Sequence, residues 1–260
     1  MKSGTRTFTF LGTGTSVGVP MIGCECHVCQ SADPRNSRYR SSVVIGTPAG
    51  NLLIDTGPEM RLQLLRAKIR IVHAVLYTHY HVDHLFGLDD LRLMPRLLNG
   101  PVPIYCTDEV EAVIRNTFAY AFRGNADGKS GPVPCLEFER ITAQPFEALG
   151  QPIVPIPLIH NIFDVFGYRF GDVAYCTDVN IIPESSWPLL EGVRILVIDC
   201  LRYKPHPAHL SLSESLSVIE RVRPERAFLT HMGHEFDYNE LNPKLPQGVE
   251  MAYDGLTFTF

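Results

Sequence analysis

The 260-residue sequence has no apolar run that approaches the roughly 18 residues a membrane span needs. Its first ten residues, MKSGTRTFTF, also lack the apolar stretch of a secretory signal. Basic residues are fewer than acidic ones, 23 against 28, and the formal net charge is −5. Broad binding to nucleic acid needs a basic face, which this balance does not favour. We therefore expect a cytoplasmic protein with no membrane partner, whose ligand is a small molecule rather than nucleic acid.

Internal repeats, charge blocks and an obvious linker are missing as well. The 45% apolar content is typical of a soluble globular protein, and the length suits one large domain. We expect one domain over residues 1–260, of the α/β class, in which apolar strands alternate with helices. The longest predicted helices cover 84–98, 107–122 and 212–222. The Gly- and Pro-rich stretch 123–134 is expected to form a mobile loop.

Five apolar, strand-like runs share one feature: each ends in a single polar residue that can bind a metal ion. A strand that ends in such a residue brings it to the rim of a sheet, where loops converge. One such ending is unremarkable, but five of them predict a shared site. The five residues are Asp55, His79, His160, Asp178 and His231.

The segment THYHVDH, residues 78–84, places four of the candidate ligands within six positions. His79 and His81 are two residues apart, so their side chains point the same way in an extended chain. After a turn, Asp83 and His84 can approach the same cavity from the opposite side. Neutral imidazole suits zinc and similar ions. The segment can therefore serve two ions, with the distant His160, Asp178 and His231 completing their coordination.

The cysteines also form one cluster, in which Cys24, Cys26 and Cys29 follow the spacing CxCxxC. In a reducing compartment such a cluster favours metal over disulfides. A structural zinc needs a fourth ligand. His27 lies inside the loop, where reaching the same ion would strain the backbone. His234, three residues after His231, can reach it instead, which would place a small zinc-binding loop at about 20–40 close to the other site.

THYHVDH resembles the signature of the metallo-β-lactamase superfamily. The fold of that superfamily is an αββα sandwich, two mixed sheets flanked by helices, with a dinuclear metal site at one edge of the sheets. The resemblance implies that one ion is held by His79, His81 and His160. It implies that the second is held by Asp83, His84 and His231, and that Asp178 bridges the two ions.

Three further segments narrow the resemblance: GTGTSVGVP at 12–20, GCECHVC at 23–29 and HMGH at 231–234. Together with HxHxDH they resemble the PhnP-like branch of the superfamily. Members of that branch are phosphodiesterases that act on 5-phosphoribosyl 1,2-cyclic phosphate in phosphonate breakdown. The resemblance implies a structural zinc ion bound by Cys24, Cys26, Cys29 and His234.

The expected charge of the dinuclear site favours hydrolysis of an anion. Two divalent ions with Asp83 and Asp178 leave a charge of +2, and a bridging hydroxide leaves +1. Metal ions hold hydroxide at neutral pH, and a pair of them suits in-line attack on phosphorus. We therefore expect a metal-dependent phosphoric diester hydrolase, in which a bridging hydroxide attacks a small, cyclic phosphodiester. Histidine and carboxylate ligands accept both zinc and manganese, so the sequence leaves the choice of catalytic metal open.

Two residues are expected to act in catalysis, Asp83 and His209. The resemblance implies a histidine that protonates the departing ribose oxygen, which His209 in KPHPAHLSL matches best, with His206 as the alternative. Asp55 is expected to accept the free N–H of a metal-bound histidine, although it could equally cap a helix.

Arg38 and Arg40, together with Arg35, are candidates for contact with a substrate phosphate, because arginine forks match phosphate oxygens. Solvated arginines are the alternative. Two other functions stay open: a tRNA-processing endonuclease of the same superfamily, and a non-hydrolytic protein like PqqB. A homodimer is compatible with the sequence, but no motif indicates it.

Overall fold

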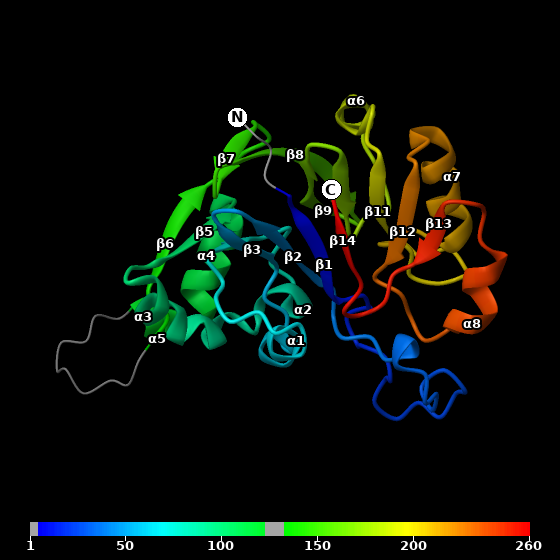
Figure 1. Ribbon diagram of the computed structural model, residues 1–260, viewed down its shortest axis with the longest axis horizontal. Helices are drawn as coiled ribbons and strands as arrows, with labels where there is room; N and C mark the ends of the chain where they lie inside the picture. The colour runs from blue at the N-terminus through cyan, green and yellow to red at the C-terminus, as the bar shows by residue number, and fades with distance from the viewer. Residues whose placement is uncertain (1–4, 123–132) are drawn as a thin grey trace.

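The computed structural model describes residues 5–122 and 133–260, which form two sheets packed face to face (Figure 1). The strands of the first sheet are β1 Thr7–Gly12, β2 Ser42–Thr47, β3 Gly50–Ile54, β4 Ala74–Leu76, β5 Val102–Cys106, β6 Leu136–Arg140 and β14 Thr257–Thr259. Those of the second are β7 Phe146–Ala148, β8 Gln151–His160, β9 Phe163–Phe170, β10 Val173–Cys176, β11 Ile195–Asp199, β12 Arg226–Thr230 and β13 Val249–Met251. The order is β14-β1-β2-β3-β4-β5-β6 in one and β13-β12-β11-β10-β9-β8-β7 in the other.

Alternating side chains give each sheet two buried faces. In β2, Val43 and Ile45 face the core between the sheets, whereas Val44 packs into a second core on the outer face. In β11 of the second sheet, Val197 faces the core between the sheets, whereas its neighbours Leu196 and Ile198 pack into a third core on the outer face. Because both faces are apolar, each sheet needs a layer of helices on its outside.

Helices supply those outer layers. They are α1 Met60–Arg66, α2 Val82–Leu85, α3 Met94–Leu98, α4 Asp108–Thr117, α5 Ala119–Phe122, α6 Trp187–Leu190, α7 Leu212–Val222 and α8 Tyr238–Leu241. Short 3₁₀ helices cover η1 Pro34–Asn36, η2 Leu88–Leu93, η3 Glu184–Ser186 and η4 Asn242–Lys244. Apolar residues of α1 and α4 pack on the first sheet, and those of α7 pack on the second. The expected αββα sandwich is confirmed.

The predicted helix over 84–98 is wrong in its continuity, since the structure has α2, η2 and α3 there. The amide of Gly87 donates to the carbonyl of Thr56 at 2.8 Å instead of continuing α2. Pro95, which lacks an N–H, lies in the first turn of α3, where no such donor is needed. The predicted helix over 212–222 is confirmed as α7, which begins at a capping box of Ser211 and Glu214.

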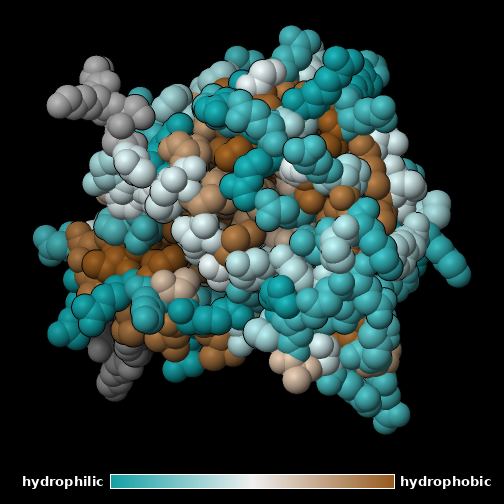
Figure 2. Space-filling model, turned by 45° about the vertical axis from the view of Figure 1, so that its right-hand side comes forward, coloured by the Kyte–Doolittle hydropathy of each residue, from teal (hydrophilic) through white to brown (hydrophobic). Residues whose placement is uncertain are grey.

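The surface is mostly hydrophilic in the view of Figure 2, with hydrophobic side chains gathered over part of it. Leu62 and Leu65 of α1 and Leu93 and Leu97 near α3 are among the exposed apolar residues. Within the described part of the chain, none of the helices has the length and apolar character needed to cross a bilayer. Of the predicted loop over 123–134, residues 123–132 lie outside the described residues.

Parallel pairing sets the position of the site. In the first sheet β3, β4, β5 and β6 run parallel to one another, and in the second β10, β11, β12 and β13 do so. The carboxyl ends of neighbouring parallel strands therefore meet at one edge of each sheet, which is where ligands bind in open α/β sheets.

Candidate metal centre

Residues at the ends of strands from both sheets meet at this edge. Asp55 follows β3, His79 comes after β4, His160 ends β8, Asp178 follows β10 and His231 follows β12. Three of them have positive φ angles, 64° at Asp55, 52° at Asp178 and 57° at His231. Non-glycine residues adopt this left-handed conformation at an energetic cost, and such residues cluster at functional sites.

Three histidines form the first part of the cluster. His79, His81 and His160 each offer a ring nitrogen, and these atoms lie within 4.8 Å of one another. The ring centroids of His79 and His81 are 4.6 Å apart, and those of His81 and His160 are 5.1 Å apart. The three residues that the resemblance assigns to one ion are thus brought together from two sheets.

Two carboxylates and two histidines form the second part. Ligand atoms of Asp83, His84, Asp178 and His231 also lie within 4.8 Å of one another. Nε2 of His84 is 3.2 Å from Oδ1 of Asp178, and Nε2 of His231 is 3.2 Å from its Oδ2. Asp178 also has an oxygen close to ring nitrogens of His160 and His209. Asp178 therefore lies between the two parts of the cluster.

Hydrogen bonds fix the orientation of the histidines. Oδ2 of Asp55 accepts from Nδ1 of His84 at 2.7 Å and from the hydroxyl of Thr78 at 2.8 Å. That hydroxyl in turn accepts from Nδ1 of His79 at 2.9 Å. Nδ1 of His160 donates to the carbonyl of Ala208 at 2.7 Å. In each ring Nδ1 carries the proton, so the lone pair of Nε2 is left for another partner.

Several of these nitrogens are buried without a hydrogen-bond partner. Among the described residues, Nε2 of His79, Nε2 of His84 and both ring nitrogens of His231 find none. An unpaired buried polar atom is costly, and three such imidazoles in one cluster need an explanation. Two cations, one beside His79 and one beside His84 and His231, would give Nε2 of each of these rings a partner, so the side chains present fit a pair of divalent ions.

The charges of the cluster are also those that cation binding requires. Burial lowers the pKa values of His79, His81 and His160, which keeps these rings neutral. Burial opposes ionisation of Asp178, but the charges of His231 and His84 outweigh it and hold the pKa of its carboxyl well below the ordinary value. Metal ligands must be neutral imidazole and ionised carboxylate. The protons that Asp178 draws onto His84 and His231 are the ones a cation would displace.

His209 lies against the cluster. Its ring is stacked on that of His231, with centroids 4.5 Å apart, and it is 4.6 Å from the ring of His160. Nδ1 of His209 donates to Oδ2 of Asp199 at 2.7 Å, so Nε2 is the free position of the ring. The alternative residue His206 lies farther out, with its Nδ1 accepting from the amide of Ala208. The geometry favours His209 as the histidine at this site.

Sequence reasoning missed Asp199 and Thr78. Asp199 ends the apolar strand β11, so it carries the same signal as the five strand-end residues that were recognised. Thr78 stands next to His79 and gives no signal of its own, because a threonine after a strand is common. Asp55 accepts from Nδ1 of His84, which is the contact expected of it if His84 binds a metal ion. Asp55 caps no helix, since the residue at the N-cap of α1 is Glu59.

The predicted phosphate contact by Arg38 is wrong, because Arg38 is only 1% exposed and its guanidinium is used inside the protein. Nη1 donates to the carbonyl of Gly233 at 3.0 Å, and Nη2 donates to the carbonyl of Phe236 at 2.6 Å. Arg35 is paired with Asp33. Arg40 forms an ion pair with Glu59 and donates to the carbonyl of Ser16. A phosphate contact by Arg40 stays a prediction, and its charge is already shared.

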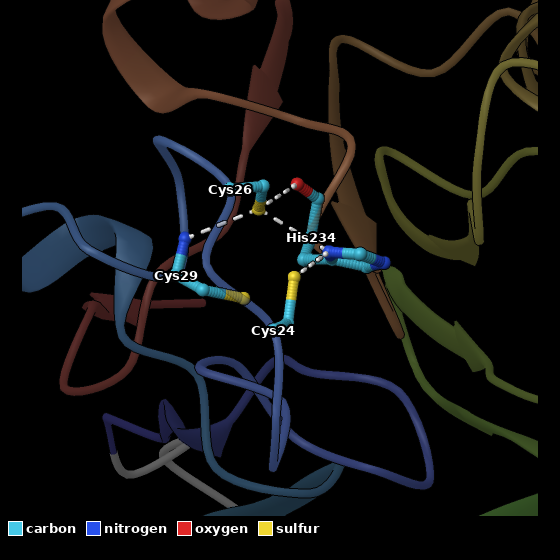
Figure 3. Close-up of side chains that lie close together, drawn as sticks. All are labelled: Cys24, Cys26, Cys29 and His234. Atoms are coloured by element: carbon cyan, nitrogen blue, oxygen red, sulfur yellow. Dashed lines mark hydrogen bonds between the residues drawn. The ribbon is translucent and has the colours of Figure 1, made fainter.

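The three clustered cysteines and His234 form a separate group. Figure 3 shows their side chains directed toward a common centre, and their ligand atoms lie within 4.8 Å of one another. Nδ1 of His234 is 3.2 Å from Sγ of Cys24 and 3.3 Å from Sγ of Cys26. The amide of Cys29 lowers the pKa of the Cys26 thiol to about 6, whereas burial raises that of Cys29 to about 11. The thiolate of Cys26 therefore forms readily, whereas that of Cys29 is opposed. A zinc ion would stabilise both thiolates.

Replacing Cys24 by serine tests this group. We expect Cys24→Ser to lose about one zinc equivalent per chain. Loss of a structural metal destabilises by more than about 4 kcal/mol, which corresponds to a fall in Tm of roughly 8–16 °C in a domain of this size. Elemental analysis and thermal unfolding measure the two effects. Cys135→Ser, at an exposed cysteine outside the group, is the control. Unchanged zinc content and Tm in Cys24→Ser would contradict the assignment.

Comparison with known proteins agrees with this geometry. A family described as a beta-lactamase superfamily domain matches residues 50–232. A crystal structure described as a new diphosphatase from the PhnP family is 40% identical, with a TM-score of 0.92, covering 98% of this chain and 97% of that one. The zinc-bound PqqB structure from Methylobacterium extorquens is 19% identical, with a TM-score of 0.79 over 97% of this chain and 99% of that chain, and shows the shared fold alone.

A curated relative extends beyond this chain. The octanoyltransferase of Porphyromonas gingivalis is 35% identical over 95% of this chain, and the chain spans about half of that protein's length. The family match covers more than half of the chain, and the PhnP-family structure matches it nearly end to end. The chain therefore belongs to the metallo-β-lactamase superfamily, and within it to the PhnP-like branch.

Proposed function

We propose that this chain is a metal-dependent hydrolase of small phosphate esters, with two divalent ions in its active site and one structural zinc. The observation that carries the proposal is the group of seven histidine and aspartate side chains, three of whose imidazoles have buried nitrogens left unpaired by the described residues. His79, His81 and His160 would hold one ion and Asp83, His84 and His231 the other, with Asp178 shared. Zinc or manganese would suit these ligands.

The charge of the loaded site selects the substrate class. Two divalent ions with the carboxylates of Asp83 and Asp178 carry a net charge of +2, which attracts an anionic ester. When bound, such a pair of ions lowers the pKa of water and polarises a phosphoryl oxygen. The protein's own task is to hold the seven ligands in place, which Asp55, Thr78 and the carbonyl of Ala208 do by orienting three of the rings.

His209 supplies the proton that hydrolysis needs at the leaving oxygen. Its Nε2 is the free nitrogen beside His160 and His231, and Asp199 accepts from Nδ1 on the other side of the ring. The carboxylate of Asp199 holds the ring in one orientation and leaves Nε2 as the position that carries the proton. The proton on Nε2 then passes to the departing oxygen, and water restores it.

Within this class we propose a small cyclic phosphodiester, such as 5-phosphoribosyl 1,2-cyclic phosphate, as the substrate. The PhnP-like branch supports that choice and a role in phosphonate breakdown. A diphosphate is the second candidate, because the 40% identical structure is described as a diphosphatase. A cytoplasmic location and a homodimer stay predictions.

A panel of substrates tests the proposal. With manganese or zinc present, we expect turnover of bis(p-nitrophenyl) phosphate and faster turnover of a ribosyl cyclic phosphate, with 2′,3′-cyclic nucleotides, a diphosphate ester, a lactone and a tRNA precursor as the comparisons. The highest kcat/KM on the diphosphate ester would favour the second candidate. Turnover of the lactone far above every phosphate ester, or cleavage of the tRNA precursor alone, would contradict the proposed class.

A further inference from the structure

Arg38 contacts the backbone on both sides of His234. Its Nη1 donates to the carbonyl of Gly233, directly before His234, and its Nη2 donates to the carbonyl of Phe236, two residues after it. Burying an arginine costs free energy because its charge loses contact with water, and Arg38 is almost fully buried. Its two terminal nitrogens bind carbonyls of one short segment, Gly233 and Phe236. The guanidinium therefore fixes the position of one member of the cysteine–histidine group.

The same residue also holds the segment that carries the cysteines. The amide of Arg38 donates to the carbonyl of Val19 at 2.7 Å, and the amide of Val19 donates back at 2.9 Å. Asn36, which accepts from Nη2 of Arg38 at 3.2 Å, donates to the hydroxyl of Ser31 at 3.0 Å. Val19 precedes the three cysteines and Ser31 follows them. Arg38 thus ties both ends of the cysteine loop to the segment around His234.

Little freedom remains between His234 and His231. The amide of Met232 donates to the carbonyl of Thr13 at 2.8 Å, its carbonyl accepts from Thr15 at 3.2 Å, and the amide of Gly233 donates to the carbonyl of Leu201 at 2.8 Å. A Cβ on Gly14, between those two threonines, would lie 2.7 Å from the carbonyl oxygen of Arg38. Both residues that separate the two histidines are held by hydrogen bonds, so His231 and His234 belong to one fixed segment and their positions are set together.

Charge adds to the mechanical link. Three thiolates with one zinc ion carry a net charge of −1 in a partly buried site. Arg38 is a buried cation beside this region. Burial lowers its pKa to about 10, while the charges of Asp254, Asp237 and Cys29 favour its ionised form. Zinc binding at the cysteines and the fork of Arg38 therefore stabilise the same arrangement of the Gly233–Phe236 segment.

We propose that Arg38 is a positioning residue that couples the two metal centres, so that metal bound by Cys24, Cys26, Cys29 and His234 raises the affinity of the His231-containing centre for its own ion. This coupling rests on the proposed metal-dependent function. Coupling between binding sites is reciprocal, and typical values correspond to about 5–150-fold in affinity. The cysteine–histidine group then acts on the active site through the placement of His231, which itself has a positive φ angle.

Cobalt titration of the whole protein measures the coupling without an activity assay. Cobalt bound by thiolates gives a charge-transfer absorption that cobalt at a histidine and carboxylate site lacks, so the two centres are followed separately. We expect the cobalt affinity of the His231 centre to be about 5–150-fold lower in Cys24→Ser, in which the cysteine centre is disabled, than in the wild type. When the same comparison is made in the Arg38→Met background, with and without Cys24→Ser, the ratio of the two cobalt affinities should be close to one, because the link between the centres is already cut.

Two further variants make the result specific. Arg35→Met removes an arginine of the same segment that pairs with Asp33 at the surface, and it should retain the full wild-type coupling. Arg38→Lys keeps the charge but cannot bridge two carbonyls with one fork, and it should lose most of the coupling while remaining folded. If Arg38→Met fails to fold, Arg38→Lys decides. Equal coupling in Arg38→Lys and the wild type, or no coupling in the wild type, would overturn the proposal.

The failure of this coupling and of the proposed function are distinguishable. If wild-type protein binds cobalt at both centres with independent affinities, the coupling is wrong and the metal-dependent function stands. If no cobalt binds at the His231 centre under any condition, the proposed function is wrong and the coupling is wrong with it.

Discussion

Asp178→Asn should reduce kcat/KM by about 10⁴-fold or more and leave the protein unable to retain both active-site ions. The two carboxylate oxygens of Asp178 face His84 and His231, and one also lies near His160, so this residue belongs to both halves of the cluster. Asparagine has nearly the same shape but no negative charge. Metal ions contribute several kcal/mol to catalysis, and each 1.36 kcal/mol is a factor of ten.

Kinetics on a phosphodiester and elemental analysis of the same sample measure this effect together. Asp172→Asn is the matched control: it lies just before the strand that precedes Asp178, but it is exposed and paired with Arg194. The control should keep wild-type activity and metal content. Asp178→Asn with two tightly held active-site ions and normal turnover would show that Asp178 has no shared role.

His209→Gln should lower kcat by roughly 10²–10⁴-fold with little change in metal content. The loss should be largest for an alkoxide leaving group, which needs a proton, and small for p-nitrophenolate, which departs without one. Asp199→Asn should move kcat in the same direction by a smaller factor, because it leaves the ring in place but removes the carboxylate that accepts from Nδ1. The ratio of rates on the two leaving groups is the measurement.

His206→Gln provides the comparison, since the ring of His206 is 5.4 Å from that of His209, yet His206 belongs to none of the groups of close ligand atoms found among the described residues. It should behave as the wild type on both substrates. Equal losses for His209→Gln on the alkoxide and phenolate substrates would contradict proton donation. A larger leaving-group effect in His206→Gln would transfer that role to His206.

The sequence predicts the site better than the helices that surround it. Polar residues at the ends of several buried strands are together a strong signal, because the cost of burying them needs a compensating partner. His160 and Asp178 were predicted in this way, although they lie far from the segment 78–84 in the chain. The break of the helix over 84–98 has no such signal. It follows from the bond between Gly87 and Thr56, a tertiary contact that periodicity does not contain.

Arg38 shows the opposite limit. Its neighbours Arg35 and Arg40 are at least partly exposed, and the sequence does not distinguish the three. Only the folded chain brings the carbonyls of Gly233 and Phe236 to the guanidinium, at a separation of nearly 200 residues. Asp199 was missed although it also ends an apolar strand. Its role depends on its contact with His209, which only the folded chain brings about.

The number and position of bound metal ions test the central claim most directly. A crystal structure with anomalous scattering measured at the zinc and manganese edges should show three ions per chain. Two should lie about 3.5–4 Å apart, one against His79, His81 and His160 and the other against Asp83, His84 and His231, with Asp178 between them; the third should lie among the cysteines and His234. Metal-saturated crystals with no anomalous peak between the two histidine groups would contradict the claim.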